Sequence, residues 1–96
     1  MSLSPKDPAE IITVTFDFSA LADAVSSPLI TCTTIAGRVD TSVQAMLSGD
    51  PQITDKKVLQ RIIGGLDGNT YKIRCQANDA DGERWVLSGE LVVATA

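Results

Sequence analysis

The sequence contains no histidine, and only four of its 96 residues are aromatic. Without histidine, the chain lacks the commonest general base, the usual partner of a Ser or Cys nucleophile, and the commonest metal ligand. A Ser-His-Asp or Cys-His enzyme is therefore excluded within one chain. We expect a protein that is not an enzyme and has no catalytic residues, no cofactor and no metal ion. With so few aromatic side chains, its core must be mostly aliphatic.

Positive charge is also scarce, because eight Lys and Arg face twelve Asp and Glu and leave a formal net charge of −4. Binding to a phosphate backbone needs clustered Lys and Arg, so we expect no nucleic-acid partner. No apolar run approaches the roughly 18 residues of a membrane span. The first seven residues lack the apolar stretch of a signal peptide, so we expect no membrane partner either.

Cysteine occurs twice, at Cys32 and Cys75, too few for a disulfide framework. The two positions fall on what would be the second and the penultimate strands, where an antibody-type domain has its disulfide between sheets. In such domains the second Cys follows the corner tyrosine by two residues, whereas Cys75 follows Tyr71 by four. We predict two buried, reduced and unreactive thiols.

The dominant pattern is an alternation of apolar and polar residues, which predicts strands with one buried face. It is clearest over residues 10–19, where Ile12, Val14, Phe16 and Phe18 share one face. Further strands are predicted over residues 29–35, 41–47, 56–63, 69–78 and 84–94. Residues 19–28 are too short for a stable helix and predict a loop or one helical turn.

Turn chemistry separates these segments. Residues 48–51, with the sequence Ser-Gly-Asp-Pro, predict a turn that ends the third strand. Residues 79–82 predict a hairpin turn in which Gly82 supplies the positive φ. Six or seven short strands with such turns are typical of an all-β antiparallel sandwich of the immunoglobulin or fibronectin type III class, with about seven strands.

We expect residues 1–8 to form an N-terminal arm and residues 9–96 a single β-sandwich domain. Residues 1–3 are interpreted as an expression-vector remnant and left out of the fold argument. The predicted core comprises the inward residues of each strand. They are Ile12, Val14, Phe16, Phe18, Ile30, Cys32, Val43, Ala45, Leu47, Leu59, Leu66, Tyr71, Ile73, Cys75, Trp85, Leu87 and Leu91.

The most specific stretch precedes the fifth predicted strand, where Leu66 and Gly68 lead into Tyr71. This order is similar to the tyrosine corner of immunoglobulin-like domains, in which the Tyr hydroxyl bonds back to upstream backbone. In that arrangement Leu66 would close the bottom of the core, and Gly68 would permit the turn.

The chain also resembles a narrower group, the small immunoglobulin-like structural proteins of tailed bacteriophages and prophages. Members are described as fibre–tail adaptor or minor virion proteins. The resemblance runs from about residue 6 to 93 and is carried by residues 6–10 (KDPAE), 16–20 (FDFSA), 58–62 (VLQRI), 64–71 (GGLDGNTY), 74–75 (RC) and 81–82 (DG). It implies a role in virion assembly or attachment, and no catalytic residues.

Three weaker patterns are interpreted structurally. Residues 77–88 faintly match a calcium loop, but Ala77 and Ser88 stand where ligands are needed. A solvated acidic hairpin is the better interpretation, although a weak Ca²⁺ site shared with another loop stays open. Glu10, Asp17 and Glu90 are expected on outward positions of a solvated face. The glycines at 64, 65 and 68 precede a strand instead of the helix that a phosphate loop requires.

Four outward positions are candidates for contact with other proteins. Lys72 and Arg74 alternate on one strand and would form a small positive stripe suited either to solubility or to an acidic neighbour. Val86 and Val92 lie on the outer face of the last strand. Two interpretations of these valines stay open: they belong to a contact patch, or they pack under the N-terminal arm.

The functional hypothesis is a non-enzymatic virion protein of a phage or prophage, made and assembled in the bacterial cytoplasm. It would bind tail, connector or fibre proteins by surface complementarity, as a homo-oligomer in the particle. The alternative is an adhesion or carbohydrate-recognition module excised from a larger protein. A metal-assisted or carboxylate enzyme is disfavoured, since no histidine and no ligand cluster are present.

Overall fold

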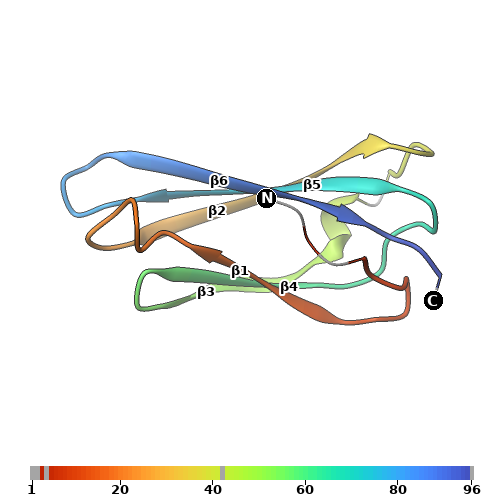
Figure 1. The fold of residues 1–96 in the computed structure, drawn as a ribbon, viewed down its shortest axis with the longest axis horizontal. Helices are drawn as coiled ribbons and strands as arrows, with labels where there is room; N and C mark the ends of the chain where they lie inside the picture. The colour runs from red at the N-terminus through yellow and green to blue at the C-terminus, as the bar shows by residue number, and fades with distance from the viewer. Residues whose placement is uncertain (1–2, 4, 42, 96) are drawn as a thin grey trace.

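The computed structural model describes residues 3, 5–41 and 43–95. In this part of the chain, six strands form two three-stranded antiparallel sheets that face each other (Figure 1). An isolated bridge between Lys6 and Val93 adds a seventh extended segment. The expected all-β antiparallel sandwich is confirmed.

One sheet has the order β1-β4-β3 and the other β2-β5-β6. The first contains β1 (Ile12–Asp17), β4 (Lys57–Ile62) and β3 (Leu47–Thr54). The second contains β2 (Ser26–Ala36), β5 (Thr70–Asn78) and β6 (Arg84–Val92). A short 3₁₀ turn, η1 (Val43–Met46), lies between β2 and β3 in the chain. Each sheet therefore has two edge strands, β1 and β3 in the first sheet and β2 and β6 in the second.

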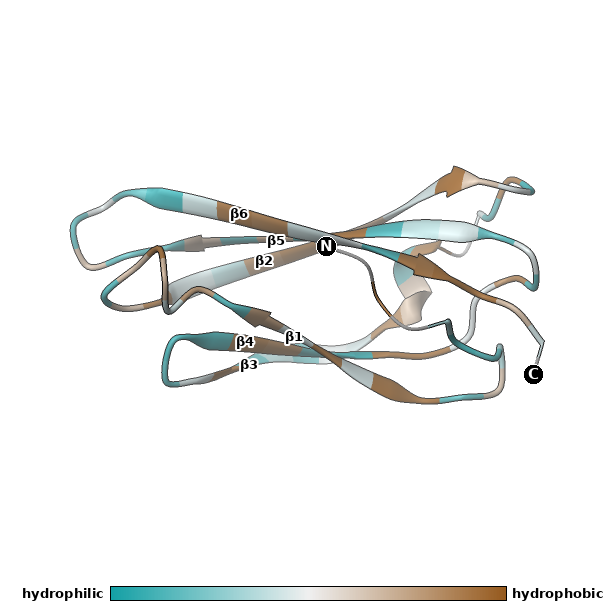
Figure 2. Cartoon of the chain, in the orientation of Figure 1, coloured by the Kyte–Doolittle hydropathy of each residue, from teal (hydrophilic) through white to brown (hydrophobic). Residues whose placement is uncertain are grey.

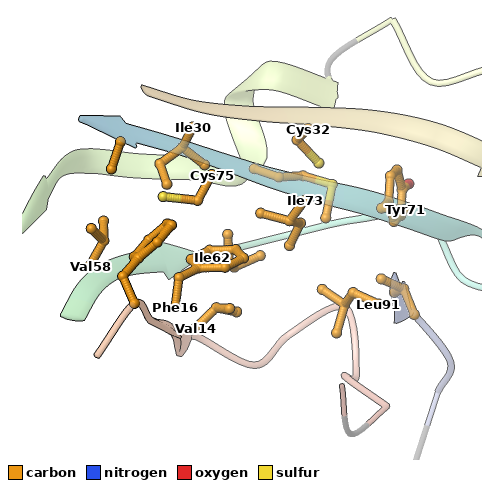
Figure 3. Close-up of a cluster of buried hydrophobic side chains, with 14 of the residues drawn as sticks. Val14, Phe16, Ile30, Cys32, Val58, Ile62, Tyr71, Ile73, Cys75 and Leu91 are labelled. Atoms are coloured by element: carbon orange, nitrogen blue, oxygen red, sulfur yellow. The ribbon is translucent and has the colours of Figure 1, made fainter. Parts of the chain in front are cut away.

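The core lies between the sheets, where buried side chains from both sheets point toward one another (Figure 3). Hydrophobic bands alternate with hydrophilic ones along the strands (Figure 2), as one buried face requires. Nine predicted core residues are buried: Val14, Phe16, Phe18, Ile30, Cys32, Tyr71, Ile73, Cys75 and Leu91. Six more are partly buried: Ile12, Val43, Leu47, Leu66, Trp85 and Leu87.

The prediction for β4 placed the wrong face of the strand in the core. Val58, Gln60 and Ile62 point into the core, so Leu59 lies on the opposite face and is only partly buried. The reason is that Gln60, although 1% exposed, donates from Nε2 to the carbonyl oxygens of Ser48 (3.2 Å), Gly49 (3.3 Å) and Arg61 (3.0 Å). A polar side chain can be buried where its donors are satisfied.

The prediction for the third strand was also wrong. Residues 43–46 form η1 instead of a strand, which leaves Ala45 exposed. The strand β3 instead continues through residues 48–51, the predicted turn. An irregular register between Ser48 and Gln52 accommodates these residues, and Pro51 is tolerated because β3 is an edge strand with a bulge.

The other turns agree with the prediction. After β1, the N–H groups of Leu21 and Ala22 both donate to the carbonyl oxygen of Phe18 at 2.9 Å, which closes one helical turn. The β5–β6 hairpin closes with Asp79 N to Glu83 O at 2.8 Å, and Gly82 has a φ of 84°.

The N-terminal arm runs along the outer edge of β6. The Lys6 N–H donates to Val92 O (2.9 Å), and Ala94 N–H donates to Lys6 O (2.8 Å). The Lys6 side chain is 1% exposed and donates from Nζ to the carbonyl oxygens of Asp7 (2.9 Å) and Gly64 (2.8 Å). Burial lowers the pKa of Lys6, and the carboxylates of Glu10 and Asp7 oppose this shift in part. The arm is therefore docked on the sandwich.

Candidate protein-binding face

Tyr71, near the start of β5, joins three segments through its hydroxyl group. The hydroxyl accepts hydrogen bonds from Leu66 N–H (2.8 Å) and from Asn69 Nδ2 (3.3 Å), and it donates to the Asp40 carboxylate (2.9 Å). These three bonds use the one donor and two acceptor sites of a phenol. Burial is the main cause of a raised pKa for Tyr71. The hydroxyl thus ties the turn before β5 to the segment after β2.

The turn itself places Gly68 at a φ of 87°, with its N–H donating to Val93 O at 2.8 Å. Leu66 is partly buried beneath it. These are the positions at which the sequence suggested a corner.

Asn69 and Asp40 also hold the corner together, and the sequence analysis missed both. The Asn69 side chain is buried and bonds the backbone of Arg38 twice, accepting from Arg38 N–H (2.9 Å) and donating to Arg38 O (2.8 Å). Gly37 lies so close to the Asn69 amide that a Cβ atom there would collide with it. Asn69 has no distinguishing signal in the sequence, because asparagine is common in turns.

The four candidate contact residues share one surface. Antiparallel register places Lys72 opposite Glu90, Arg74 opposite Ser88, Thr70 opposite Val92, and Gln76 opposite Val86. Their side chains point away from the core, on the outside of the β2-β5-β6 sheet. The strand β2 extends this surface with its own outward residues. We call it the outer face, and it comprises Leu29, Thr31, Thr33, Thr70, Lys72, Arg74, Gln76, Arg84, Val86, Ser88, Glu90 and Val92.

The outer face has an aliphatic residue near each end and charge between them. Leu29 and Val86 lie in one cross-strand row, because both pair with Gln76, and Val92 lies toward the other end. Lys72 and Arg74 occupy the centre. A face of this composition suits a protein contact, in which apolar groups supply buried area and charges supply orientation.

Charge is distributed unevenly between this face and the rest of the chain. Three cations and the carboxylate of Glu90 give the outer face a net charge of +2. Because the whole chain carries −4, the remainder carries −6. The outer face is therefore net positive in an acidic protein, although five of the eight Lys and Arg residues lie elsewhere.

The described residues of the N-terminal arm leave the two valines exposed. Lys6 bonds the backbone carbonyl of Val92, at the edge of the sheet. The side chains of Val86 and Val92 nevertheless remain 41% exposed. The contact role of these two valines stays a prediction.

The two cysteines lie in the same sheet. Cys32 lies opposite Ile73 and Cys75 opposite Ile30, on adjacent strands of one sheet, so they cannot form a disulfide between sheets. Both are free and buried, and burial raises the pKa of each thiol to about 11, with the Asp40 charge contributing at Cys32.

The acidic hairpin is organised by its own hydrogen bonds. Asp79 Oδ1 accepts from the N–H groups of Asp81 and Glu83, both at 2.9 Å, and Oδ2 accepts from the Trp85 indole at 3.0 Å. The bond from Trp85 is the main reason that the pKa of Asp79 is lowered. Across residues 3, 5–41 and 43–95, no group of three or more His, Cys, Asp or Glu side chains is placed to hold a metal ion.

The three outward carboxylates are likewise not gathered into a pair. Asp17 ends β1 in one sheet, whereas Glu90 lies on β6 in the other. Glu10 accepts from Asp7 N–H at 2.6 Å in the turn before β1. In the described part of the chain, no helix has the length and apolar content needed to cross a membrane.

A comparison with known protein families identifies a relationship. A family model described as Podophage GP4 fiber-tail adaptor protein gp77 matches residues 6–93. Neither the curated proteins nor the solved structures contain a match.

Proposed function

Because the chain belongs to this family of podophage fibre–tail adaptor proteins, we propose that it is a non-enzymatic component of a phage virion. It joins tail and fibre proteins by direct protein–protein contact and acts in several symmetric copies in the particle. Its place of assembly is the bacterial cytoplasm, and its final place is the virion.

One observation carries the choice of surface. The strand register brings Lys72, Arg74, Val86 and Val92 onto one exposed sheet face, although they come from two strands. Arginine is enriched at protein interfaces, and exposed apolar side chains beside it supply area that a partner can bury. The outer face is therefore the surface we assign to one of the two partners.

The topology supports an immunoglobulin-like class for this scaffold. In constant-type immunoglobulin domains the strands B, E and D lie in one sheet and C, F and G in the other. The orders β1-β4-β3 and β2-β5-β6 correspond to these two sets. The tyrosine near the start of β5 also stands where the F strand of such domains has its corner tyrosine.

A carbohydrate-recognition module is the less favoured alternative. Such modules bind sugars on exposed aromatic platforms. Here Phe16, Phe18 and Tyr71 are fully buried, and Trp85 is partly buried with its indole N–H bonded to Asp79. No aromatic platform is left to support that role.

Binding assays with charge-reversed variants test the proposal. The tail and fibre proteins of the same particle are immobilised separately, and binding of the full chain to each is measured. We expect K72E/R74E to lose at least about tenfold in affinity for one of them. K57E/R61E is the matched control, because Lys57 and Arg61 are exposed on β4, the central strand of the other sheet.

Mass spectrometry of purified particles supplies the second readout. The proposal expects peptides of this chain at a copy number comparable with tail components. Absence from intact particles together with failure to bind either protein would overturn it. Equal losses in the two charge-reversed variants would reject the outer face as the contact surface.

A further inference from the structure

The strand β2 lies at the edge of its sheet with a row of backbone groups directed outward. The bonds Asp79 N to Glu83 O and Val93 N to Asn69 O show that odd-numbered residues of β5 bond to β6. Because bonding alternates along an antiparallel strand, the even-numbered residues of β5 bond to β2. Their partners on β2 are the odd-numbered residues.

It follows that the N–H and C=O groups of Ile30, Cys32 and Thr34 point away from the sheet. One of these groups is already engaged, since Gln44 in η1 donates from Nε2 to the Cys32 carbonyl at 2.6 Å. The amide of Gln44 thus supplies the donor that a neighbouring strand would supply. This contact shows the chemistry that the edge accepts, which is that of a peptide group.

A groove of about 410 Å³ lies directly beside this edge. Its walls are the second half of β2, the segment 37–40 and η1. Ile35 (47% exposed), Val39 (88% exposed) and the partly buried Val43 give it apolar side chains. Among the described residues, no strand pairs with β2 on this side. A strand edge next to an apolar groove is the combination used in strand addition, where the backbone gives affinity and a side-chain pocket gives specificity.

Charge indicates which kind of segment fits. Arg74 and Lys72 lie beside Thr31 and Thr33 of β2 on the outer face. The outward side chains of a strand added to β2 would lie on the far side of these threonines. A Glu or Asp there is close enough for its carboxylate to meet the extended side chain of Arg74 or Lys72. The groove lining contains both Arg38 and Asp40 and so adds no net charge. The attraction for an acidic segment therefore comes from Lys72 and Arg74.

We propose that the outward edge of β2 and its groove receive an extended acidic segment of a neighbouring virion protein. The segment adds a fourth strand to the β2-β5-β6 sheet, with one of its N–H groups replacing the Gln44 amide at the Cys32 carbonyl. It inserts an aliphatic side chain between Ile35, Val39 and Val43. This inference rests on the proposed function, since it specifies how a virion partner is held.

The edge of β1 differs and serves as an internal reference. The bond from Phe18 N to Lys56 O places the even-numbered residues of β1 toward β4, so the N–H groups of Thr13 and Thr15 also point outward. The exposed side chains of this strand are Thr13, Thr15 and Asp17. The β1 edge therefore offers peptide groups beside polar side chains, with the exposed Ile11 just before it.

Amide hydrogen exchange of the labelled full chain tests the proposal. The probes are overlapping peptides that cover the tail and fibre proteins of the same particle. With a bound acidic peptide, exchange at Ile30, Cys32 and Thr34 should slow at least about tenfold. Exchange at Thr13 and Thr15 should stay unchanged.

Substitution in the groove gives an independent readout. I35D should weaken peptide binding at least about tenfold, because it places a carboxylate in an apolar contact and repels an acidic segment. I11D is the matched control, since Ile11 is 68% exposed and precedes β1, and it should bind normally. Circular dichroism establishes that both variants fold.

Three outcomes would overturn the proposal. If the intact partner proteins bind but the three β2 amides remain unprotected, the strand-addition mode is wrong while the adaptor role stands. If these amides become protected without peptide as protein concentration rises, a second copy of this chain is the occupant. If neither peptides nor intact virion proteins bind, both this inference and the adaptor role fail.

Discussion

The hydroxyl group of Tyr71 donates a hydrogen bond to the Asp40 carboxylate at 2.9 Å, between residues 31 positions apart in the chain. The same oxygen accepts from the N–H of Leu66. One side chain therefore fixes the turn before β5 and also the segment that forms a wall of the groove beside β2.

Y71F should destabilise the protein by about 1–3 kcal/mol, because the Leu66 N–H and the Asp40 carboxylate lose a partner in a partly buried site. The benzene ring stays in the core, so packing is conserved. The loss is measured by urea unfolding monitored by circular dichroism. An unfolding free energy equal to that of the natural chain would show that water replaces the hydroxyl at no cost.

Comparing alanine substitutions at Gly37 and Gly49 separates the cost of contact with Asn69 from the cost of a strained backbone. Both have a positive φ, of 103° and 73°, but a Cβ atom meets the Asn69 side chain only at Gly37, whereas nothing lies within 4 Å at Gly49. Each alanine substitution carries the cost of the left-handed region, about 1–2 kcal/mol.

G37A should therefore destabilise the protein by a further 1–3 kcal/mol or so relative to G49A, as overpacking typically does. Urea unfolding of the two variants side by side measures the difference. Equal losses would mean that the Asn69 side chain moves aside without cost.

The hydroxyl oxygen of Thr34 is buried, and no hydrogen-bond partner is found for it among the described residues. Replacing the hydroxyl by a methyl group removes an unsatisfied polar atom and keeps the shape of the side chain. T34V should stabilise the protein by about 1 kcal/mol in thermal or urea unfolding. T33V is the control, because Thr33 is exposed on the same strand; a larger gain there would contradict the explanation.

The buried thiols should make stability fall at alkaline pH. Burial raises the pKa of Cys32 and Cys75 from 9.0 to about 11, so the folded state holds these protons more tightly than the unfolded state. The resulting stabilisation is complete below about pH 9 and is lost as the pH rises toward 11. C32A/C75A should lose less stability over this window, measured by urea unfolding at fixed pH values. Parallel pH curves for the two proteins would contradict the prediction.

Thiol reagents provide a second test of the same burial. At pH 8 neither thiol should react in the folded protein, and both should react once urea has unfolded it. Rapid reaction of one thiol under native conditions would mean that its strand opens locally.

The class of fold followed from the sequence because alternation is a local property. Apolar and polar residues alternate along the whole of β1 and on to Phe18. The buried set Val14, Phe16 and Phe18 follows directly. The turn positions of Gly68 and Gly82 were recognisable for the same reason, since positive φ is a local demand that glycine meets. The absence of histidine was equally visible without a structure.

The candidate face was recognisable only in part. Lys72 and Arg74 could be paired on one strand, as could Val86 and Val92. Whether all four share a face depends on the register between β5 and β6 and on which side chains of each strand point into the core. The groove was not predictable, because its walls are β2, the segment 37–40 and η1, and residues 43–46 had been expected to form a strand.

The sequence by itself determined the alternating strands, the glycine turns and the lack of histidine chemistry, since each depends on neighbours in the chain. Only the tertiary structure decided which face of β4 is buried. Val58 and Ile62 alternate with Leu59 and Ile63, so both faces are apolar and a period of two cannot distinguish them. The choice falls to the face that lets Gln60 reach the carbonyls of Ser48 and Gly49 at the irregularity in β3, because a buried amide is stable only where distant backbone satisfies it.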